Sequence, residues 1–371
     1  MSELAIKRTR EQLGIWPAWK LALQVGDDDS ASRLLVVEKT MRIGRAIVRF
    51  GGIAGVGTRR KYRLKGYASR VMEASTALMA ERGYDMGILY GIGGFYHRFG
   101  YGVVFPISRL VVKTEALLCA AGQFKTRAMK RTDARAVQRL YNRLNRERNA
   151  SVVRPAGWSY FEVSQDFNAP GRTIVVEDAR GRIQAYATWQ VRDDQFLVAE
   201  VAGTGNDVFV SLGKALGQRA KRAKMDRAIF DLPKDDAFAD FCMPLGCEQR
   251  VTYPQNSDAM GRIVHLRPLM EKLVPELSKR SAGFRGRVSV AIETDIGTVG
   301  LGIDRNGVRV IRGGVLAVKM PQLVLTQLVM GYRRAADIAA DPGVSIPTRA
   351  MPVLDLLFPR RDGYMWWSDR F

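Results

Sequence analysis

The sequence predicts a mixed α/β protein that ends in a separate α+β domain. Between residues 53 and 90, a short apolar run, a glycine-containing turn, a segment with apolar residues at helical spacing and a second apolar run follow one another. This is the order of a strand–helix–strand unit. Closer to the C-terminus, strand-like segments come first and helical segments follow, which is typical of an α+β domain. A chain of 371 residues is longer than the chains that usually fold around a single hydrophobic core, so we expect two or three domains.

The N-terminal part is the hardest to assign. Trp16-Pro17-Ala18-Trp19 interrupts any helix, and residues 26–30 have the composition of a turn. Short strands are expected at 33–38 and 41–50, paired as a hairpin. The apolar run 53–58, a helix over 68–79 and a strand over 86–90 complete the first unit.

A basic turn separates this run from the helix. Residues 63–68 are Arg-Leu-Lys-Gly-Tyr-Ala. At the start of a helix the first backbone N–H groups lack partners within the helix, and the helix dipole favours an anion. Gly66 lets a phosphate approach the backbone closely, and Arg63 and Lys65 supply positive charge. By itself the turn is a weak indication, because Arg, Lys and Gly are common in turns.

A second motif follows the next strand, Phe95-Tyr96-His97-Arg98-Phe99-Gly100-Tyr101. Arg-x-x-Gly-x-Ala after a strand, followed by Phe-Tyr-x-x-Phe-Gly-Tyr, resembles the acetyl-CoA motif of the GNAT N-acetyltransferases. The residues Gly-Ile-Ala-Gly-Val-Gly-Thr at 52–58 and the aromatic C-terminus narrow the resemblance to the Eis (enhanced intracellular survival) type. That type joins two GNAT-like domains to a sterol-carrier-like third domain.

The resemblance implies three domains. Residues 1–122 would be a GNAT domain that binds acetyl-CoA, closed by strands within 102–114. This domain looks shortened at its N-terminus, because a complete GNAT domain carries a further strand and a pair of helices there. Residues 123–266 would be a second GNAT-like domain, and residues 267–371 a sterol-carrier-like α+β domain. Lipid binding is not implied, because a fold does not carry a function by itself.

The second unit repeats the expected order without the acetyl-CoA motif. A helix is predicted at 134–145, strands at 172–177, 184–191 and 196–202, and a helix at 208–224. Where a second acetyl-CoA loop would lie, the chain has Gly203-Thr204-Gly205-Asn206-Asp207, so we expect no cofactor there. The basic helix that follows is interpreted first as a solvated face and otherwise as a polyanion-binding patch.

The third unit is expected to begin with a helix over 267–273, with Pro268 in its first turn. Strands are predicted at 288–294, 298–303, 307–311 and 316–319. Helices are predicted at 321–330, 333–340 and 353–357.

By resemblance, acetyl-CoA would lie along one strand end, the basic turn and the end of the next strand. The expected cofactor-binding residues are Val56, Gly57, Thr58, Arg63, Leu64, Lys65, Gly66, Tyr67, Ala68, Ser69, Gly91 and Ile92.

Tyr96 matches the tyrosine that protonates the departing thiolate in many GNAT enzymes, and a phenol with a pKa of about 10 can donate that proton. The alternative is an aromatic cluster with Phe95, Phe99 and Tyr101 that packs the core. Phe95 and Phe99 are expected to pack there, because residues four apart share a helical face.

The chain ends Tyr364-Met365-Trp366-Trp367-Ser368-Asp369-Arg370-Phe371, whereas most termini are polar and frayed. In the Eis type the C-terminal carboxylate reaches the active site and accepts a proton, so the resemblance gives that role to the carboxylate of Phe371. Asp369 is the second candidate. The alternative is that the aromatic residues only seal the third domain.

Composition limits the other classes of function. The three cysteines (Cys119, Cys242 and Cys247) and two histidines lack metal-site spacing, so no metal is expected. No run approaches the roughly 20 apolar residues of a membrane span, and no secretory signal is evident, so a cytoplasmic location is the default expectation. The net charge of +21 favours an anionic cofactor or a polyanion; a solvated basic surface is the alternative.

The resemblance therefore implies an acetyl-CoA-dependent N-acetyltransferase for a primary amine, either on an aminoglycoside-like small molecule or on a lysine. The resemblance also implies a homo-oligomer, a trimer or hexamer. From a different class, a non-catalytic protein that binds acetyl-CoA or nucleic acid is the alternative.

Overall fold

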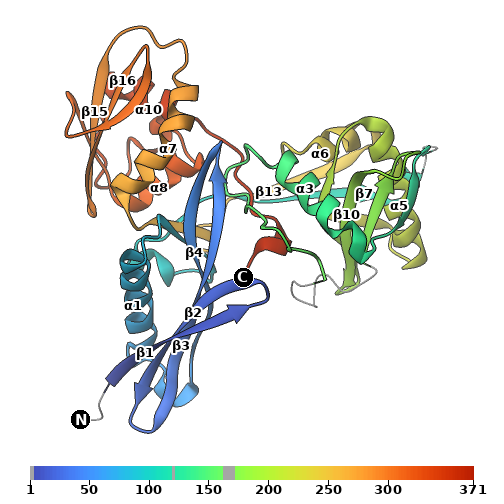
Figure 1. The fold of residues 1–371 in the computed structure, drawn as a ribbon, viewed down its shortest axis with the longest axis horizontal. Coiled ribbons are helices and arrows are strands. Elements are labelled where there is room, and N and C mark those ends of the chain that lie inside the picture. Colours follow the sequence, from blue (N-terminus) through green and yellow to red (C-terminus); the bar gives the residue numbers. More distant parts are fainter. Residues whose placement is uncertain (1–3, 119–121, 162–171) are drawn as a thin grey trace.

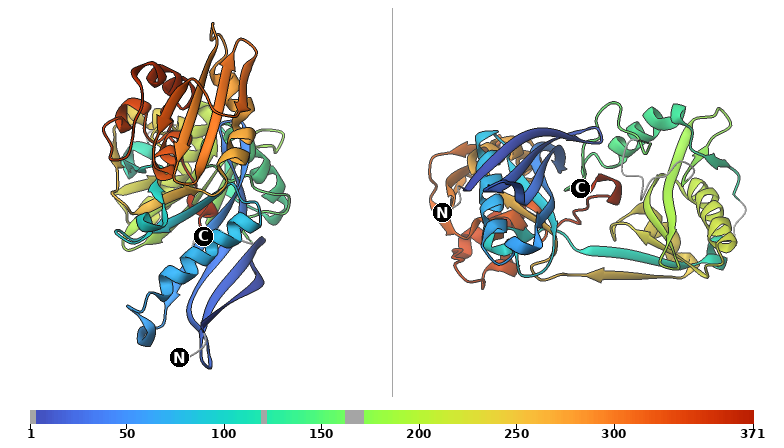
Figure 2. Two further views of the ribbon diagram at one scale, coloured as in Figure 1. Left: turned by 90° about the vertical axis from the view of Figure 1, so that its left-hand side faces the viewer. Right: turned by 90° about the horizontal axis from the view of Figure 1, so that it is seen from below.

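The computed structural model describes residues 4–118, 122–161 and 172–371. Its described strands form two seven-stranded sheets and one four-stranded sheet. Each sheet lies in a lobe of its own, and the C-terminus lies between the first and second lobes (Figures 1 and 2). The mixed α/β class and the separate C-terminal sheet are thus confirmed.

The first sheet has the order β1-β2-β3-β4-β5-β14-β6. Neighbouring strands from β1 to β4 are antiparallel, β5 runs parallel to β4, and α1 packs on β2, β3 and β4. These elements are β1 (Leu4–Leu13), β2 (Trp16–Val25), β3 (Asp28–Ile43), β4 (Ala46–Thr58), α1 (Tyr67–Glu81) and β5 (Met86–Gly91).

The N-terminal part of this sheet differs from the prediction. The first described residues form β1 and β2, so additional strands are present before β3, whereas residues 4–58 contain no helix. The hairpin predicted from 33–38 and 41–50 is also wrong. β3 continues through Lys39 and Thr40, and the chain turns at Gly44 and Arg45. Gly44 has a φ of +56°, the left-handed conformation that a two-residue hairpin turn needs.

Two strands are exchanged between the first and second lobes. The segment 102–114 was expected to close the first domain, but only β6 (Gly102–Val103) joins the first sheet. β7 (Ile107–Lys113) pairs with β12 and β13 in the second sheet. In return, β14 (Asp258–Ile263) pairs with β5 and β6 in the first. The expected boundaries at 122 and 266 therefore do not separate the sheets. Figure 2 shows the two connecting segments between the lobes in its view from below.

The second sheet has the order β13-β7-β12-β11-β10-β9-β8, with α3 and α5 packed on it. The predicted helices and strands of this unit are confirmed within a few residues. Its other elements are α2 (Thr114–Leu118), β8 (Lys125–Ala128), α3 (Ala134–Leu144), β9 (Thr173–Glu177), β10 (Ile183–Arg192), β11 (Gln195–Gly203), α5 (Asn206–Arg222), β12 (Arg227–Asp231), α6 (Ala237–Cys242) and β13 (Cys247–Thr252).

The third sheet has the order β17-β16-β15-β18. As predicted, one helix precedes its strands and the others follow them, but the first helix, α7, continues to Arg280 instead of ending at 273. The elements are α7 (Leu266–Arg280), β15 (Val288–Thr294), β16 (Gly297–Asp304), β17 (Gly307–Ile311), β18 (Leu316–Lys319), α8 (Gln322–Met330), α9 (Ala335–Ile338) and α10 (Met351–Leu357). The sterol-carrier likeness of this lobe stays a prediction.

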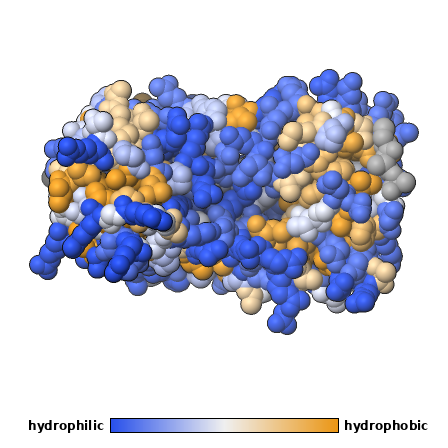
Figure 3. Space-filling model, turned by 90° about the horizontal axis from the view of Figure 1, so that it is seen from above, coloured by the Kyte–Doolittle hydropathy of each residue, from blue (hydrophilic) through white to orange (hydrophobic). Residues whose placement is uncertain are grey.

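The third lobe is held against the first through α7. The Lys272 ammonium lies 2.7 Å from the buried carboxylate of Asp85, which also accepts the Arg49 backbone N–H. Viewed from above, the surface between the two ends of the molecule is mainly hydrophilic, and hydrophobic residues gather toward the ends (Figure 3). None of the helices in the described ranges has the length and apolar character of a membrane span.

The strand exchange makes a testable prediction. A fragment of residues 1–122 lacks β14, which lies between β5 and β6, and so leaves the β5 edge open to non-native pairing. We expect this fragment to show no cooperative thermal transition by circular dichroism, in contrast to the full chain. A fragment that melts cooperatively would show that the first sheet does not need the exchanged strand.

Candidate active site

β4 and β5 separate at the centre of the first sheet. They pair from Phe50 with Met86 to Ile53 with Leu89, and no further. At the same place the β3–β4 register shifts, and Gly55 has a φ of +58°, which together mark a β-bulge that bends β4. We name the opening beyond this pair the β4–β5 split.

The predicted strand residues lie at this split. Val56, Gly57 and Thr58 form the end of β4 beyond its last pair with β5, so one backbone edge of this segment has no neighbouring strand. Such an edge can bind an extended ligand through backbone hydrogen bonds. Gly91 ends β5, and Ile92, just after it, is 74% exposed.

The basic turn leads directly from this edge into α1. Leu64 and Gly66 have φ angles of 61° and 76°, and Gly66 caps the helix without a side-chain hydrogen bond. Within the described chain, the backbone N–H groups from Leu64 to Ser69 have no hydrogen-bond acceptor. Successive free N–H groups of this kind bind anions, and the start of α1 adds a positive dipole end. Tyr67, Ala68 and Ser69 form the first turn.

The charges around this turn are divided into two sets. Arg59 and Lys61 are engaged by Asp28, at 2.8 and 3.2 Å. Arg63 and Lys65 have no carboxylate partner within the described residues; Arg63 donates to the Thr58 carbonyl at 3.4 Å. Two cations are therefore available to an anion at the turn.

Tyr96 lies at the other side of the split, in the short 3₁₀ helix Tyr96–Phe99. Its ring covers Gly91 so closely that a Cβ on this glycine would lie 2.4 Å from Tyr96 Cδ2. Only 9% of the residue is exposed, and burial raises the pKa of the phenol. No protein acceptor is found for its hydroxyl in the part of the chain that is described.

The aromatic cluster foreseen as the alternative is also present. The ring centres of Phe95 and Phe99 lie 5.3 Å apart, and Tyr101 is fully buried. Tyr96 packs edge-on against Phe95 at 4.9 Å. Tyr96 therefore both packs in the aromatic cluster and lies beside the split.

The C-terminal residue reaches the same two strands. The ring of Phe371 rests on Gly52, where a Cβ would come within 2.7 Å of the ring carbon Cζ. Its ring centre lies 6.0 Å from that of Phe50 and 6.2 Å from that of Tyr90. Gly52 was not anticipated from the sequence, although only a residue without a side chain leaves room for this ring.

Tyr96 and Phe371 approach the split from opposite faces of the sheet. Tyr96 belongs to the cluster of Ile53 and Leu89 on the α1 side. Phe371 packs against Gly52, and successive residues of a strand point to opposite faces. The Phe371 ring lies over Gly52, within the last paired residues of β4 and β5 before the split.

A fully buried ionic network anchors the tail to the second lobe. Arg154 binds both oxygens of Glu200 (2.9 and 2.7 Å) and both oxygens of Asp369 (2.9 and 3.1 Å). Tyr141 also donates to Asp369, at 2.8 Å, and Ser368 donates to Glu200 at the same distance. Because both oxygens of Asp369 are occupied and the residue is inaccessible, it is not suited to accept the amine's proton.

Lys39 contacts the same tail from the first lobe. Its Nζ donates to the Asp369 carbonyl at 2.6 Å, and the residue is 4% exposed. Burial lowers the pKa of Lys39 to about 7, against the opposing effect of Asp369. The sequence contained an indication of this: Lys39 stands between Val37 and Met41, at the spacing of an inward-facing strand position.

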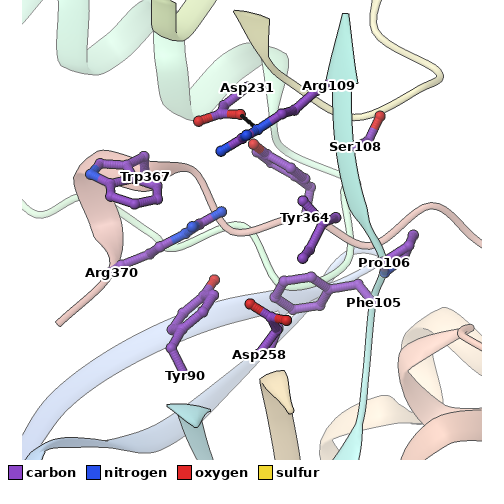
Figure 4. Close-up of a pocket in the computed structure, with 12 residues that line it drawn as sticks. Tyr90, Phe105, Pro106, Ser108, Arg109, Asp231, Asp258, Tyr364, Trp367 and Arg370 are labelled. Atoms are coloured by element: carbon purple, nitrogen blue, oxygen red, sulfur yellow. Dashed lines mark hydrogen bonds and ion pairs between the residues drawn. The ribbon is translucent and has the colours of Figure 1, made fainter. Parts of the chain in front are cut away.

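A small cavity lined by both polar and apolar residues adjoins the tail (Figure 4). The space open to the centre of a water molecule is about 30 Å³, enough for about two waters. The guanidinium of Arg370 lies 4.6 Å from the Tyr90 ring and 4.5 Å from the Trp367 ring, and burial raises the pKa of Tyr90 to about 12. Asp231 and Arg109 close the cavity with an ion pair at 2.9 Å.

No group of three or more His, Cys, Asp or Glu side chains suited to a metal occurs in the described ranges. Cys242 and Cys247 are free thiols, and Cys119 lies outside the described residues.

Comparison with known families identifies the class of the first lobe. Residues 15–104 match the family described as the acetyltransferase (GNAT) domain. This range holds β4, the basic turn, α1, β5 and Tyr96, so the part of the chain that carries the predicted motifs is similar to a GNAT acetyltransferase domain, as the motifs predicted. No curated protein matches the sequence.

Solved structures extend the similarity to nearly the whole chain. A probable N-acyltransferase from Enterococcus faecalis V583 has a TM-score of 0.77 at 18% identity, covering 96% of this chain and 89% of that one. A GCN5-related N-acetyltransferase from Kribbella flavida has a TM-score of 0.74 at 18% identity, covering 95% and 87%. Eis1 from Mycobacterium abscessus has a TM-score of 0.66 at 14% identity, covering 95% and 91%. The chain shares the fold of these proteins.

The ionic network yields a prediction about stability. Arg154→Met leaves Glu200 and Asp369 buried without a cation, which should lower the free energy of unfolding by about 3–5 kcal/mol. Arg109→Met is the matched control. Its side chain is 47% exposed in its pair with Asp231, so about 0–1 kcal/mol is expected. Thermal unfolding of both variants measures the difference, and equal shifts would contradict the importance of the buried network.

Proposed function

We propose that the protein is an acetyl-CoA-dependent N-acetyltransferase that acetylates a primary amine. The observation that carries the proposal is the β4–β5 split, which has an open strand edge, a free anion-binding turn and two candidate proton-transfer groups around it. The GNAT domain match covers most of this site, and two of the structural neighbours are named as an N-acyltransferase and an N-acetyltransferase.

The cofactor would lie along the split. The backbone of Val56, Gly57 and Thr58 would bind the pantetheine arm like an added strand, with Gly91 and Ile92 on the other side. The N–H groups from Leu64 to Ser69 would surround the pyrophosphate. Arg63 and Lys65, which lack a carboxylate partner within the described residues, would supply charge-assisted hydrogen bonds.

The reaction needs two proton transfers. The neutral amine attacks the thioester carbon, a C–N bond forms, and the C–S bond breaks to release the thiolate of CoA. The Tyr96 phenol protonates this thiolate; its raised pKa keeps the proton in place until the thiolate departs. The carboxylate of Phe371 removes the proton that the amine nitrogen loses, and the two groups act from opposite faces of the sheet.

The acceptor is proposed only as a class, a primary amine on a small molecule or a lysine side chain. A net charge of +21 makes a polycationic aminoglycoside a less suitable acceptor than an amine of low charge, because like charges repel. The second lobe is proposed to bind no acetyl-CoA. A homo-oligomer, a trimer or hexamer, is proposed from the resemblance, and a cytoplasmic location is the default expectation from the sequence.

Removing either proton-transfer group tests the mechanism. Tyr96→Phe and deletion of Phe371 should each lower kcat by roughly 10²–10⁴-fold, with little change in the KM for acetyl-CoA. CoA release would be measured with a panel of amines, and Tyr253→Phe, at an exposed tyrosine, serves as control. Wild-type kcat in both variants would refute the assignments.

Neutralising the turn tests the cofactor site separately. Arg63→Ala with Lys65→Ala should weaken CoA binding by roughly 10- to 100-fold, because charge-assisted hydrogen bonds are lost. Isothermal titration with CoA measures the affinity. The control pair, Lys214→Ala with Lys221→Ala in α5, removes the same charge from the second lobe. Equal losses in both pairs would indicate a general charge effect instead of a site at the turn.

A further inference from the structure

Lys39 occupies a position where the fold would be expected to place an apolar residue. It lies on β3 between Val37 and Met41, and both of these neighbours on the same face are fully buried. Lys39 itself is 4% exposed. Burying an ammonium group is unfavourable unless it is well partnered, so the contacts of this lysine indicate what it stabilises.

Those contacts converge on the end of the chain. The Nζ of Lys39 donates to the carbonyl of Asp369 at 2.6 Å. It also lies over the Phe371 ring, 5.3 Å from its centre, and over the Trp16 ring at 4.5 Å. A cation over an aromatic face is attracted to it, more strongly when water is excluded.

The charged groups around Lys39 explain why it binds a backbone carbonyl. The carboxylate of Asp369 acts on Lys39 electrostatically, and its two oxygens already accept from Arg154 and Tyr141. Arg154, the second cation, is bound to Asp369 and Glu200. The tail is therefore bound from two sides: Lys39 of the first lobe contacts it, and so does Arg154, which is paired with Glu200 of the second lobe.

We propose that Lys39 is a positioning residue that fixes Phe371 at the β4–β5 split. Its ammonium donates to the carbonyl of Asp369, two residues before Phe371, and attracts the Phe371 ring, which packs on Gly52. This inference rests on the proposed role of the C-terminal carboxylate as the base.

The need for such a residue follows from the chemistry. A chain end frays unless it is held, whereas a proton acceptor must stay within hydrogen-bond reach of the reacting amine. A misplacement of about 1 Å can cost a reaction as much as roughly 100-fold in rate. The anchor at Asp369 alone leaves the last two residues to be ordered by other contacts.

The test compares three variants of the full-length protein. Lys39→Met keeps an unbranched side chain without the charge, and Gly52→Ala displaces the Phe371 ring while Lys39 remains. Lys20→Met, in an exposed ion pair with Glu11 on β2 and β1, is the control. The readouts are kcat and KM for acetyl-CoA, and the rate at which a carboxypeptidase releases Phe371 from the native protein.

We expect Lys39→Met and Gly52→Ala to lower kcat by roughly 10- to 100-fold, to leave the KM for acetyl-CoA within twofold, and to release Phe371 faster. Lys20→Met should match the wild type in all three. Unchanged release of Phe371 from Lys39→Met would overturn the proposal, whatever happens to kcat. Faster release with wild-type kcat would support the positioning role and instead refute Phe371 as the base.

A pH series gives an independent readout. Burial places the pKa of Lys39 at about 7 in the folded protein, against about 10.4 for a free lysine. Between these two pH values Lys39 is protonated in the unfolded chain but mostly neutral in the folded protein. The free energy of unfolding should therefore rise with pH across this range. The melting temperature of the wild type should therefore increase relative to that of Lys39→Met from pH 6 to pH 9. A difference independent of pH would show that the pKa of Lys39 is not lowered, and would contradict its burial in the folded protein.

Discussion

The buried contact between Arg154 and Asp369 is the interaction on which the arrangement of the site depends. Arg154 lies beside the first sheet, because Val153 donates its backbone N–H to the Thr40 carbonyl at 2.9 Å. Its guanidinium binds Glu200 of the second sheet and Asp369 of the tail. A single residue thus joins both lobes and the chain end where little water can weaken the charges. Removing one member would leave the others buried and unpaired, so the three must be ordered together.

The exchanged strands make this arrangement rigid. β7 and β14 each belong to the sheet of the opposite lobe, so the chain between the first and second lobes crosses twice. Two connections resist rotation more than a single linker does. The tail between the lobes can therefore be held by contacts from both sides, with Lys39 on one and Arg154 on the other.

Local order was predictable from the sequence, whereas pairings between distant segments were not. The β4–α1–β5 unit followed from apolar periodicity and from the Arg-x-x-Gly-x-Ala turn, because each depends on residues close in the chain. The turn at Gly44 was missed, since Gly-Arg is a weak hairpin dipeptide compared with Asn-Gly. The exchange of β7 and β14 was missed because either strand fits either sheet by composition. Lys39, Gly52 and Arg154 acquire their roles only through residues hundreds of positions away in the sequence.

The position of Phe371 has a consequence for what can be joined to this end of the chain. On the proposed mechanism the base is not a side chain but the free α-carboxylate of Phe371, a group that exists only where no further residue is joined to this one. A product extended beyond Phe371, for example by a C-terminal fusion, would carry a neutral amide at that point and would lack the proposed base.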